Sequence, residues 1–147
     1  MTRRDWLLLL VGLHPSPRGL EPVRVQKALF LFAREGGIPS RERYWFVPYN
    51  YGPMSPRVYR DVDALTRAGL FERVPVAGYG WGLVRATERG RERARELAAA
   101  ADQRAAARLA AIRDEVTSLS FADLLESVYE RYPAFAERSV FRRRGAR

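Results

Sequence analysis

The chain contains no cysteine and only one histidine, His14, among its 147 residues. Without cysteine there can be no disulfide, no thiolate metal ligand and no thiol nucleophile, and a reducing cytoplasm is the simplest setting. A single histidine beside a proline is a weak basis for general base catalysis or for a zinc site. These absences predict a cytoplasmic protein that holds neither a metal nor a cofactor.

The sequence also lacks a segment that could span a membrane. An apolar run near the N-terminus covers residues 6–11 and follows two arginines and an aspartate. It is much shorter than the roughly 20 apolar residues that a spanning helix needs. No small-residue cleavage site follows it, as one would in a secretory signal peptide. We therefore expect a buried first helix over residues 4–13 and no membrane association.

Acidic residues are scarce relative to basic ones: 17 against 26, which gives a formal net charge of +9. All the basic residues are arginines except Lys27. Residues 142–147 include four arginines and are predicted to form a basic tail, whereas the remaining excess is spread along the chain. Such a balance permits contact with nucleic acid or with an acidic protein, but it does not require either.

Aromatic side chains concentrate in residues 44–59, which three prolines and a glycine interrupt. Neither a regular helix nor a central strand tolerates this spacing of proline. The segment predicts an extended strip over residues 44–49 and then a rigid turn. A helix follows over residues 55–67, with Ser55 as its N-cap and Pro56 in its first position.

The order of elements indicates a winged helix. A second helix is expected from Pro22 to about Gly36, and a β-hairpin with a glycine-rich turn follows the third helix. We predict a mainly α fold with a small β-hairpin wing. The winged-helix domain covers residues 1–86, and a C-terminal helical extension, residues 87–141, packs on it.

A single long helix is expected over residues 88–119, rich in alanine, arginine and glutamate. Small and apolar residues recur along it at steps of three or four, which marks one narrow stripe. The stripe either lies on its own domain or forms a homodimer in the manner of a coiled coil, and both interpretations stay open.

The end of the third helix and the hairpin resemble winged-helix regulators of the PadR and MarR type. Residues 65–70 read Leu-x-x-x-Gly-Leu, and residues 86–90 read Ala-Thr-x-x-Gly where those families have Leu-Thr-x-x-Gly. The resemblance implies a recognition helix over residues 55–67, a wing and a C-terminal dimerisation helix. The function implied is that of a DNA-binding transcriptional regulator.

A second resemblance covers about residues 23–140. The Lys-Ala-Leu-Phe-Leu run at 27–31 and the Tyr-Gly-Pro turn at 51–53, followed by Val58 and Tyr59, resemble the Panacea-type (SocA-like) domain. Residues 46–53, with a later Tyr-Pro pair, are similar to YwgA-like proteins. Phe30 departs from the tyrosine that is frequent in the family. This resemblance implies antitoxin and adaptor roles that depend on binding a protein rather than on catalysis.

The acidic residues do not form a catalytic pattern. Asp61 and Asp63 are two apart on a helix and should face different directions. The glutamates of residues 88–96 alternate with arginines, which indicates a solvated face with ion pairs. The glycines of residues 78–82 lie in a hairpin turn, not between a strand and a helix as in a phosphate-binding loop. We therefore expect no enzymatic activity.

Two sets of candidate binding residues follow. The first would bind a partner protein, such as a cognate toxin, and makes the chain an antitoxin-like or regulatory interaction module. The second would contact DNA from the outward face of the third helix, where Asp61 and Thr66 are also expected. The protein-binding set is Lys27, Trp45, Tyr49, Tyr51, Tyr59, Tyr79 and Trp81, and the DNA-binding set is Arg57, Arg60 and Arg67. For Trp45 and Tyr51, as for Phe46, a core position is the alternative.

Overall fold

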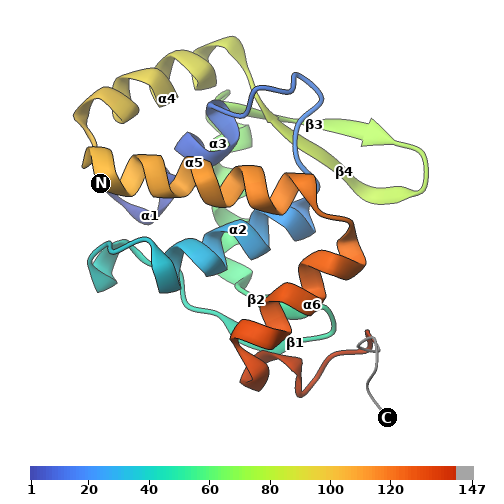
Figure 1. The fold of residues 1–147 in the computed structure, drawn as a ribbon. Coiled ribbons are helices and arrows are strands. Elements are labelled where there is room, and N and C mark those ends of the chain that lie inside the picture. Colours follow the sequence, from blue (N-terminus) through green and yellow to red (C-terminus); the bar gives the residue numbers. More distant parts are fainter. Residues whose placement is uncertain (142–147) are drawn as a thin grey trace.

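The computed structural model describes residues 1–141, except for the side chains of Tyr79 and Trp81. Six helices, two short 3-10 turns and two hairpins follow one another in this part of the chain (Figure 1). The predicted basic tail, residues 142–147, lies outside the described residues. The elements are α1 (Arg3–Gly12), α2 (Pro22–Glu35), η1 (Ser40–Glu42), β1 (Val47–Tyr49), β2 (Gly52–Met54), α3 (Pro56–Arg67), β3 (Phe71–Val76), β4 (Tyr79–Ala86), α4 (Glu88–Ala100), α5 (Gln103–Ser118), α6 (Phe121–Arg131) and η2 (Pro133–Ala136).

The predicted fold class is confirmed: the protein is mainly α-helical, with a small antiparallel β-hairpin. Helices α1, α2 and α3 precede the hairpin of β3 and β4, which projects from the helical body (Figure 1). Between α1 and α2, Leu20 pairs with Val84 of β4 through two backbone hydrogen bonds of 2.8 Å each. This bridge adds a third extended segment to the hairpin and anchors the wing to the body.

Capping side chains set where most of the helices begin. Thr2 and Asp5 form a reciprocal capping box at the start of α1, and Thr87 and Ser120 cap α4 and α6 through their hydroxyls. Ser55 precedes α3 as predicted, but its side chain makes no capping hydrogen bond. The helix starts there because Pro56 fixes a helical φ at the first position.

The expected single helix over residues 88–119 is wrong. It is broken at residues 101–102, where Ala101 adopts an extended conformation (φ −75°, ψ 160°). Asp102 then caps α5 by accepting a hydrogen bond of 2.9 Å from the N–H of Ala105. An aspartate competes for backbone donors in this way and favours a new helix start over continuation.

The break lets the two halves pack on different partners, α4 on α1 and α5 on α2. In Figure 1, α5 runs across the body and α4 lies to one side of it. The apolar stripe is consequently buried inside its own chain. The buried stripe residues are Ala94, Leu97, Ala101, Ala105, Leu109, Ile112 and Val116.

This burial resolves the choice left open by the sequence: the stripe packs within the chain. A homodimer through residues 88–119 would have to use other side chains of these helices. It also means that the extension completes the core of the winged helix rather than resting on a finished surface. Arg24 of α2 illustrates the contact, donating to the backbone carbonyls of Val116 (2.6 Å) and Leu119 (2.8 Å) at the end of α5.

The apolar run of α1 is buried, as predicted. Trp6 packs edge-on against Phe32 of α2, with ring centroids 4.9 Å apart. Its indole N–H donates to Glu42 Oε1 at 2.8 Å, which satisfies the polar atom in the core. Within residues 1–141, no helix combines the length and apolar character needed to cross a membrane.

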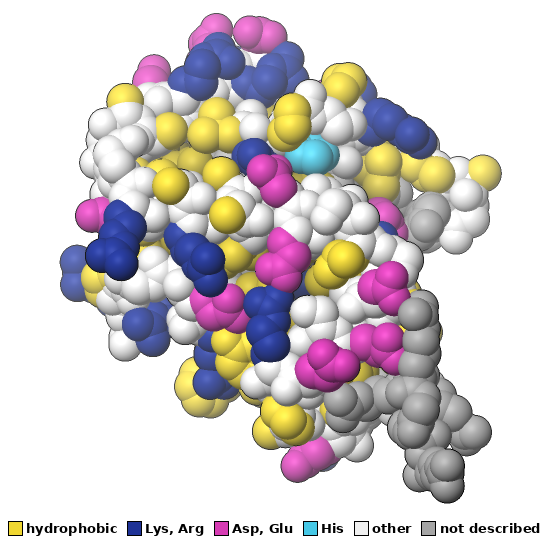
Figure 2. Space-filling view, viewed as in Figure 1, with side chains coloured by type: hydrophobic (Ala, Val, Ile, Leu, Met, Phe, Trp, Pro, Cys, Tyr) yellow, Lys and Arg dark blue, Asp and Glu magenta, His cyan; other side chains and the backbone are white. Residues whose placement is uncertain are grey.

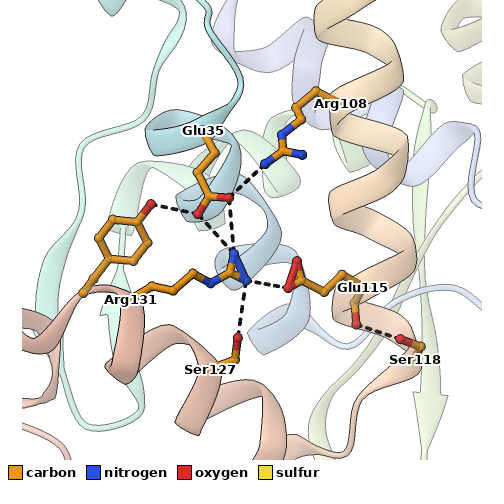
Figure 3. A network of polar contacts seen from close by, with 7 residues as sticks. Glu35, Arg108, Glu115, Ser118, Ser127 and Arg131 are labelled. Carbon is orange, nitrogen blue, oxygen red and sulfur yellow. Dashed lines mark hydrogen bonds and ion pairs between the residues drawn. The ribbon is translucent and has the colours of Figure 1, made fainter.

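A polar network joins the end of α2 to the C-terminal helices (Figure 3). Glu35 accepts hydrogen bonds from Arg108 of α5 (3.1 Å), Arg131 of α6 (3.2 Å) and the hydroxyl of Tyr132 (2.8 Å). Arg131 also pairs with Glu115. Because one carboxylate holds three donors from two other segments, the network fixes α5 and α6 relative to α2.

Candidate protein-interaction face

The aromatic segment forms a small hairpin, which the sequence did not predict. Strands β1 and β2 pair Val47 with Met54 and Tyr49 with Gly52. Gly52 has a φ of 86°, a left-handed conformation that glycine adopts without strain. Pro48 and Pro53 lie in strands of only three residues, where few ladder hydrogen bonds are needed.

Neighbouring elements hold the hairpin from three sides. A Cβ at Gly52 would lie 3.1 Å from the ring of Tyr129 in α6, so the hairpin backbone lies directly on that helix. The N–H of Val140 donates to the carbonyl of Asn50 at 2.8 Å. The C-terminal segment therefore folds back onto the hairpin, and Phe135 is buried.

Helix α2 supplies the third support through two polar side chains. Gln26 makes two hydrogen bonds of 2.9 Å to the backbone of Ser55, one donated and one accepted. Lys27 donates to the carbonyl of Pro53 at 3.1 Å. The hairpin is therefore preorganised, since its ends and its turn are each hydrogen-bonded to another part of the fold.

Lys27 is not on a surface, contrary to its place among the predicted partner-binding residues. Only 2% of the residue is exposed, and burial lowers the pKa of its amine from 10.5 to about 7. A neutral amine can still donate to the carbonyl of Pro53. The residue supports the hairpin from beneath, and a partner could not contact it without opening the fold.

Three other predicted residues of this set are exposed on the hairpin or, for Trp45, two residues before it. Trp45 is 82% exposed, and Tyr49 and Tyr51 are about half exposed, at 49% and 48%. Tyr51 also contacts the ring of Phe121, 5.7 Å away. Phe46 is buried, and so is Tyr44 at the start of the segment.

Tyr59 is half-buried on α3, where burial raises the pKa of its hydroxyl and Gln26 and Tyr49 are the neighbours that affect it. Two residues that the sequence did not indicate are also exposed. Val47 lies in β1, and Val140 is hydrogen-bonded to Asn50 in the turn of the hairpin. The alternation along β1 could have indicated Val47, whereas Val140 adjoins only because the C-terminal segment folds back. We call Trp45, Val47, Tyr49, Tyr51 and Val140 the hairpin face.

An open hollow of about 540 Å³ adjoins Trp45. We call it the Trp45 hollow, and its lining includes Arg3, Arg34 and Arg43 but no acidic residue. The guanidinium of Arg34 lies over three rings, those of Phe30, Tyr132 and Phe135, at 5.4 to 5.6 Å from their centroids. Such stacking fixes the direction of the cation without neutralising it. No sequence spacing indicates this cluster, because its rings come from α2 and from η2.

The predicted DNA-binding residues Arg57, Arg60 and Arg67 are exposed on α3. Asp61, expected to point outward with them, is only 5% exposed. Its carboxylate accepts hydrogen bonds from Tyr44 (2.6 Å) and Arg4 (3.1 Å), and this polar pairing explains why a charged residue is turned inward. The outward side of α3 is therefore more basic than its sequence suggested.

The two wing residues of the protein-binding set, Tyr79 and Trp81, have side chains outside the described residues. The backbone of β4 runs through both positions, next to the turn after β3. The structure thus places them in the wing, away from β1 and β2 along the chain, and does not assign their side chains to the hairpin face.

Many of the remaining ionisable groups on the surface form ion pairs with one another. On α4, Arg91 pairs with Glu88 at 2.8 Å and Arg93 with Glu96 at 3.0 Å. The face seen in Figure 2 intersperses basic and acidic side chains in the same way. His14 Nδ1 is buried without a hydrogen-bond partner, and burial lowers the pKa of this histidine. Within the described residues, no three His, Asp or Glu side chains form a group that could hold a metal ion.

No family model matches the chain, and neither does any curated protein or any solved structure.

Proposed function

We propose that the protein is a non-catalytic interaction module that binds a partner protein through the hairpin face. One observation carries the proposal: among the residues whose side chains are described, every exposed large hydrophobic residue lies in the hairpin, within two residues of it or, for Val140, at a segment that is hydrogen-bonded to its turn. Isolated apolar residues on a surface are ordinary, but several gathered on one feature are typical of an interaction site.

The composition and rigidity of the face favour a protein as the partner. Tryptophan, tyrosine and arginine are the residues that most often dominate the energetics of protein interfaces. Trp45 and Tyr49 have few rotatable bonds, and the hairpin that contains Tyr49 is held at Asn50, Gly52 and Pro53 by the C-terminal segment, α6 and α2. A preorganised face loses little conformational entropy on binding, which raises the affinity obtained from a given area.

The Trp45 hollow indicates the chemistry of the partner. Three arginines line it beside the exposed indole, with no carboxylate among the lining residues. The complementary segment would present an aromatic or aliphatic side chain flanked by aspartate or glutamate. A regulated protein or a cognate toxin with such a segment fits, and the antitoxin-like role is the one that the resemblance to Panacea-type domains suggests.

Selection from a displayed random-peptide library tests the proposal. The native protein should enrich peptides with an apolar residue next to acidic ones. Trp45→Ala should bind the enriched peptide about 30-fold more weakly, since truncating a central anchor costs about 2 kcal/mol or more. Arg93→Gln, on the distant face of α4, is the matched control and should bind as the native protein does. Enriched peptides that bind Trp45→Ala equally well would refute the proposal.

The antitoxin-like role needs a separate experiment with the product of the adjacent gene. Co-expressed with the tagged chain, this product should co-purify with the native protein and with Arg93→Gln, but not with Trp45→Ala. If it does not co-purify at all and the chain does not neutralise it, the antitoxin role is wrong. The peptide result still decides whether the hairpin face binds protein.

A DNA-binding regulator is the second candidate, favoured by the basic outward side of α3. Arg57, Arg60 and Arg67 lie on that side, while Asp61 is turned inward and Asp63 pairs with Arg73 at 2.5 Å. A helix of this kind can enter the major groove with its arginines toward bases and phosphates. Mobility shifts with a duplex library should show binding that weakens steeply as salt rises. No shift at low salt would exclude this function.

A further inference from the structure

A second hollow, separate from the hairpin face, is formed where three segments meet. The first turn of α1, the turn η1 and the first turn of α3 together enclose an open space of about 500 Å³. Arg3, Arg4, Arg41 and Arg57 line it, and Asp61 is its acidic residue. We call it the Arg57 hollow. Its size is within the range of small-molecule sites.

The acidic groups near the Arg57 hollow are already engaged. Asp61 is buried and accepts from both Tyr44 and Arg4, so that it positions the Arg4 guanidinium while neutralising it. Glu42 lies 3.7 Å from Arg41 but is also buried, with its other oxygen bonded to Trp6. Asp5 is a third carboxylate nearby and is also engaged, accepting from the N–H of Thr2 at 2.9 Å. Three carboxylates therefore stand against four guanidiniums, and a net positive charge remains.

Arg57 is the clearest unsatisfied member of the hollow. Within residues 1–141 it has neither a hydrogen bond to a side chain nor an ion pair, whereas Arg3 donates to the backbone carbonyl of Arg43. Bringing arginines together without enough counter-charge is unfavourable, because like charges repel. A bound anion would relieve that repulsion. Because no carboxylate of residues 1–141 forms an ion pair with Arg57, an external anion is the group that would do so.

We propose that the Arg57 hollow binds a phosphate group. The guanidiniums come from three segments, α1, η1 and α3. A tetrahedral phosphate can accept from such a set, whereas a planar carboxylate best suits one bidentate fork. Helix α3 begins at the hollow without a side-chain cap, so its positive end adds to the attraction for an anion, whereas Thr2 and Asp5 already cap α1. The phosphate would come from a small phosphorylated molecule or from a nucleic-acid backbone.

The site adjoins the Trp45 hollow, since Arg3 lines both, but no residue of the hairpin face lines the Arg57 hollow. It shares Arg57 with the second candidate function. Loss of phosphate binding would therefore leave peptide binding by the hairpin face unchanged, and the two proposals can fail separately.

Calorimetric titration with pyrophosphate, inorganic phosphate and a short DNA duplex, at constant low ionic strength, tests the proposal. The double variant Arg41→Gln, Arg57→Gln should bind the effective ligand at least about tenfold more weakly, which corresponds to about 1.4 kcal/mol. Both arginines are exposed, so the variant should keep its fold, and circular dichroism checks this. Arg91→Gln combined with Arg93→Gln is the control with the same change in charge and should retain the native affinity.

The three ligands separate the sources of phosphate. Binding of pyrophosphate or phosphate that the double variant loses supports a small-molecule site. Binding of the duplex alone, weakened by the double variant and not by the control, supports a backbone contact. The proposal is wrong if none of the three binds, or if the control variant loses as much affinity as the double variant.

Discussion

Replacing Lys27 by methionine should remove a rise in stability with pH that the native protein is expected to show. Burial lowers the pKa of Lys27 to about 7 in the folded state, whereas the unfolded chain has the ordinary value of 10.5. Between these values the unfolded chain holds a proton that the native protein lacks. The free energy of unfolding therefore increases as the pH rises through this window.

The size of the effect follows from the two pKa values. Between about pH 7.5 and 9.5 the unfolding free energy should rise by about 2.5 kcal/mol, at 1.36 kcal/mol for each unit of pKa difference. Other groups act outside this window. Burial lowers the pKa of His14, which affects stability below about pH 6.5, and raises the pKa of Tyr132 to about 12, which reduces stability only above about pH 10.

Urea unfolding at several pH values measures the effect. The native protein and Arg93→Gln should show the rise, and Lys27→Met should not. Because Lys27 is the only lysine, ¹³C-labelled lysine also gives a single Cε resonance whose titration reports the pKa directly. A titration midpoint near 10.5, or an equal rise in Lys27→Met, would refute the reasoning.

Two further substitutions test the packing of the extension. Gly90→Ala should destabilise the fold by about 2 kcal/mol or more, because its Cβ would lie only 2.0 Å from the carbonyl oxygen of Leu70. Thermal unfolding measures this, and an unchanged melting temperature would show that the helix and the hairpin separate easily. Glu35→Gln should cost about 1–2 kcal/mol, since Arg108 and Arg131 lose their shared carboxylate. Urea titration checks it, and the double variant with Arg108→Gln should lose less than the sum of the two single effects.

The starts of the helices could be predicted from the sequence where a capping residue or a proline sets them. Thr87, Ser120 and Pro56 each act within one helical turn, and the helices begin at or beside them. The break before Asp102 was missed because a continuous stripe of alanines dominated the pattern. The capping signal of a single aspartate is weaker than the helical periodicity of residues 88–119, but packing of the two halves on different partners favours the break.

The candidate site was predicted only in part. Trp45, Tyr49 and Tyr51 were found because aromatic residues on a turn are visible in the sequence. Lys27 was placed on the wrong side of the fold, since its burial depends on Tyr129 and the hairpin lying over it. The Arg57 hollow contains arginines from α1 and α3, which are more than fifty residues apart in the sequence. Local sequence patterns do not indicate such long-range contacts.

The packing of α5 on α2 affects how the protein folds while the ribosome is synthesising it. The apolar side of α2 is covered by a helix that is made much later. At synthesis rates of roughly 5–20 residues per second, α5 is completed about 4–17 s after α2. During that interval the nascent winged helix exposes an apolar surface that the finished protein never shows. We expect chaperones that recognise such surfaces to engage the chain until Ser118 has left the exit tunnel.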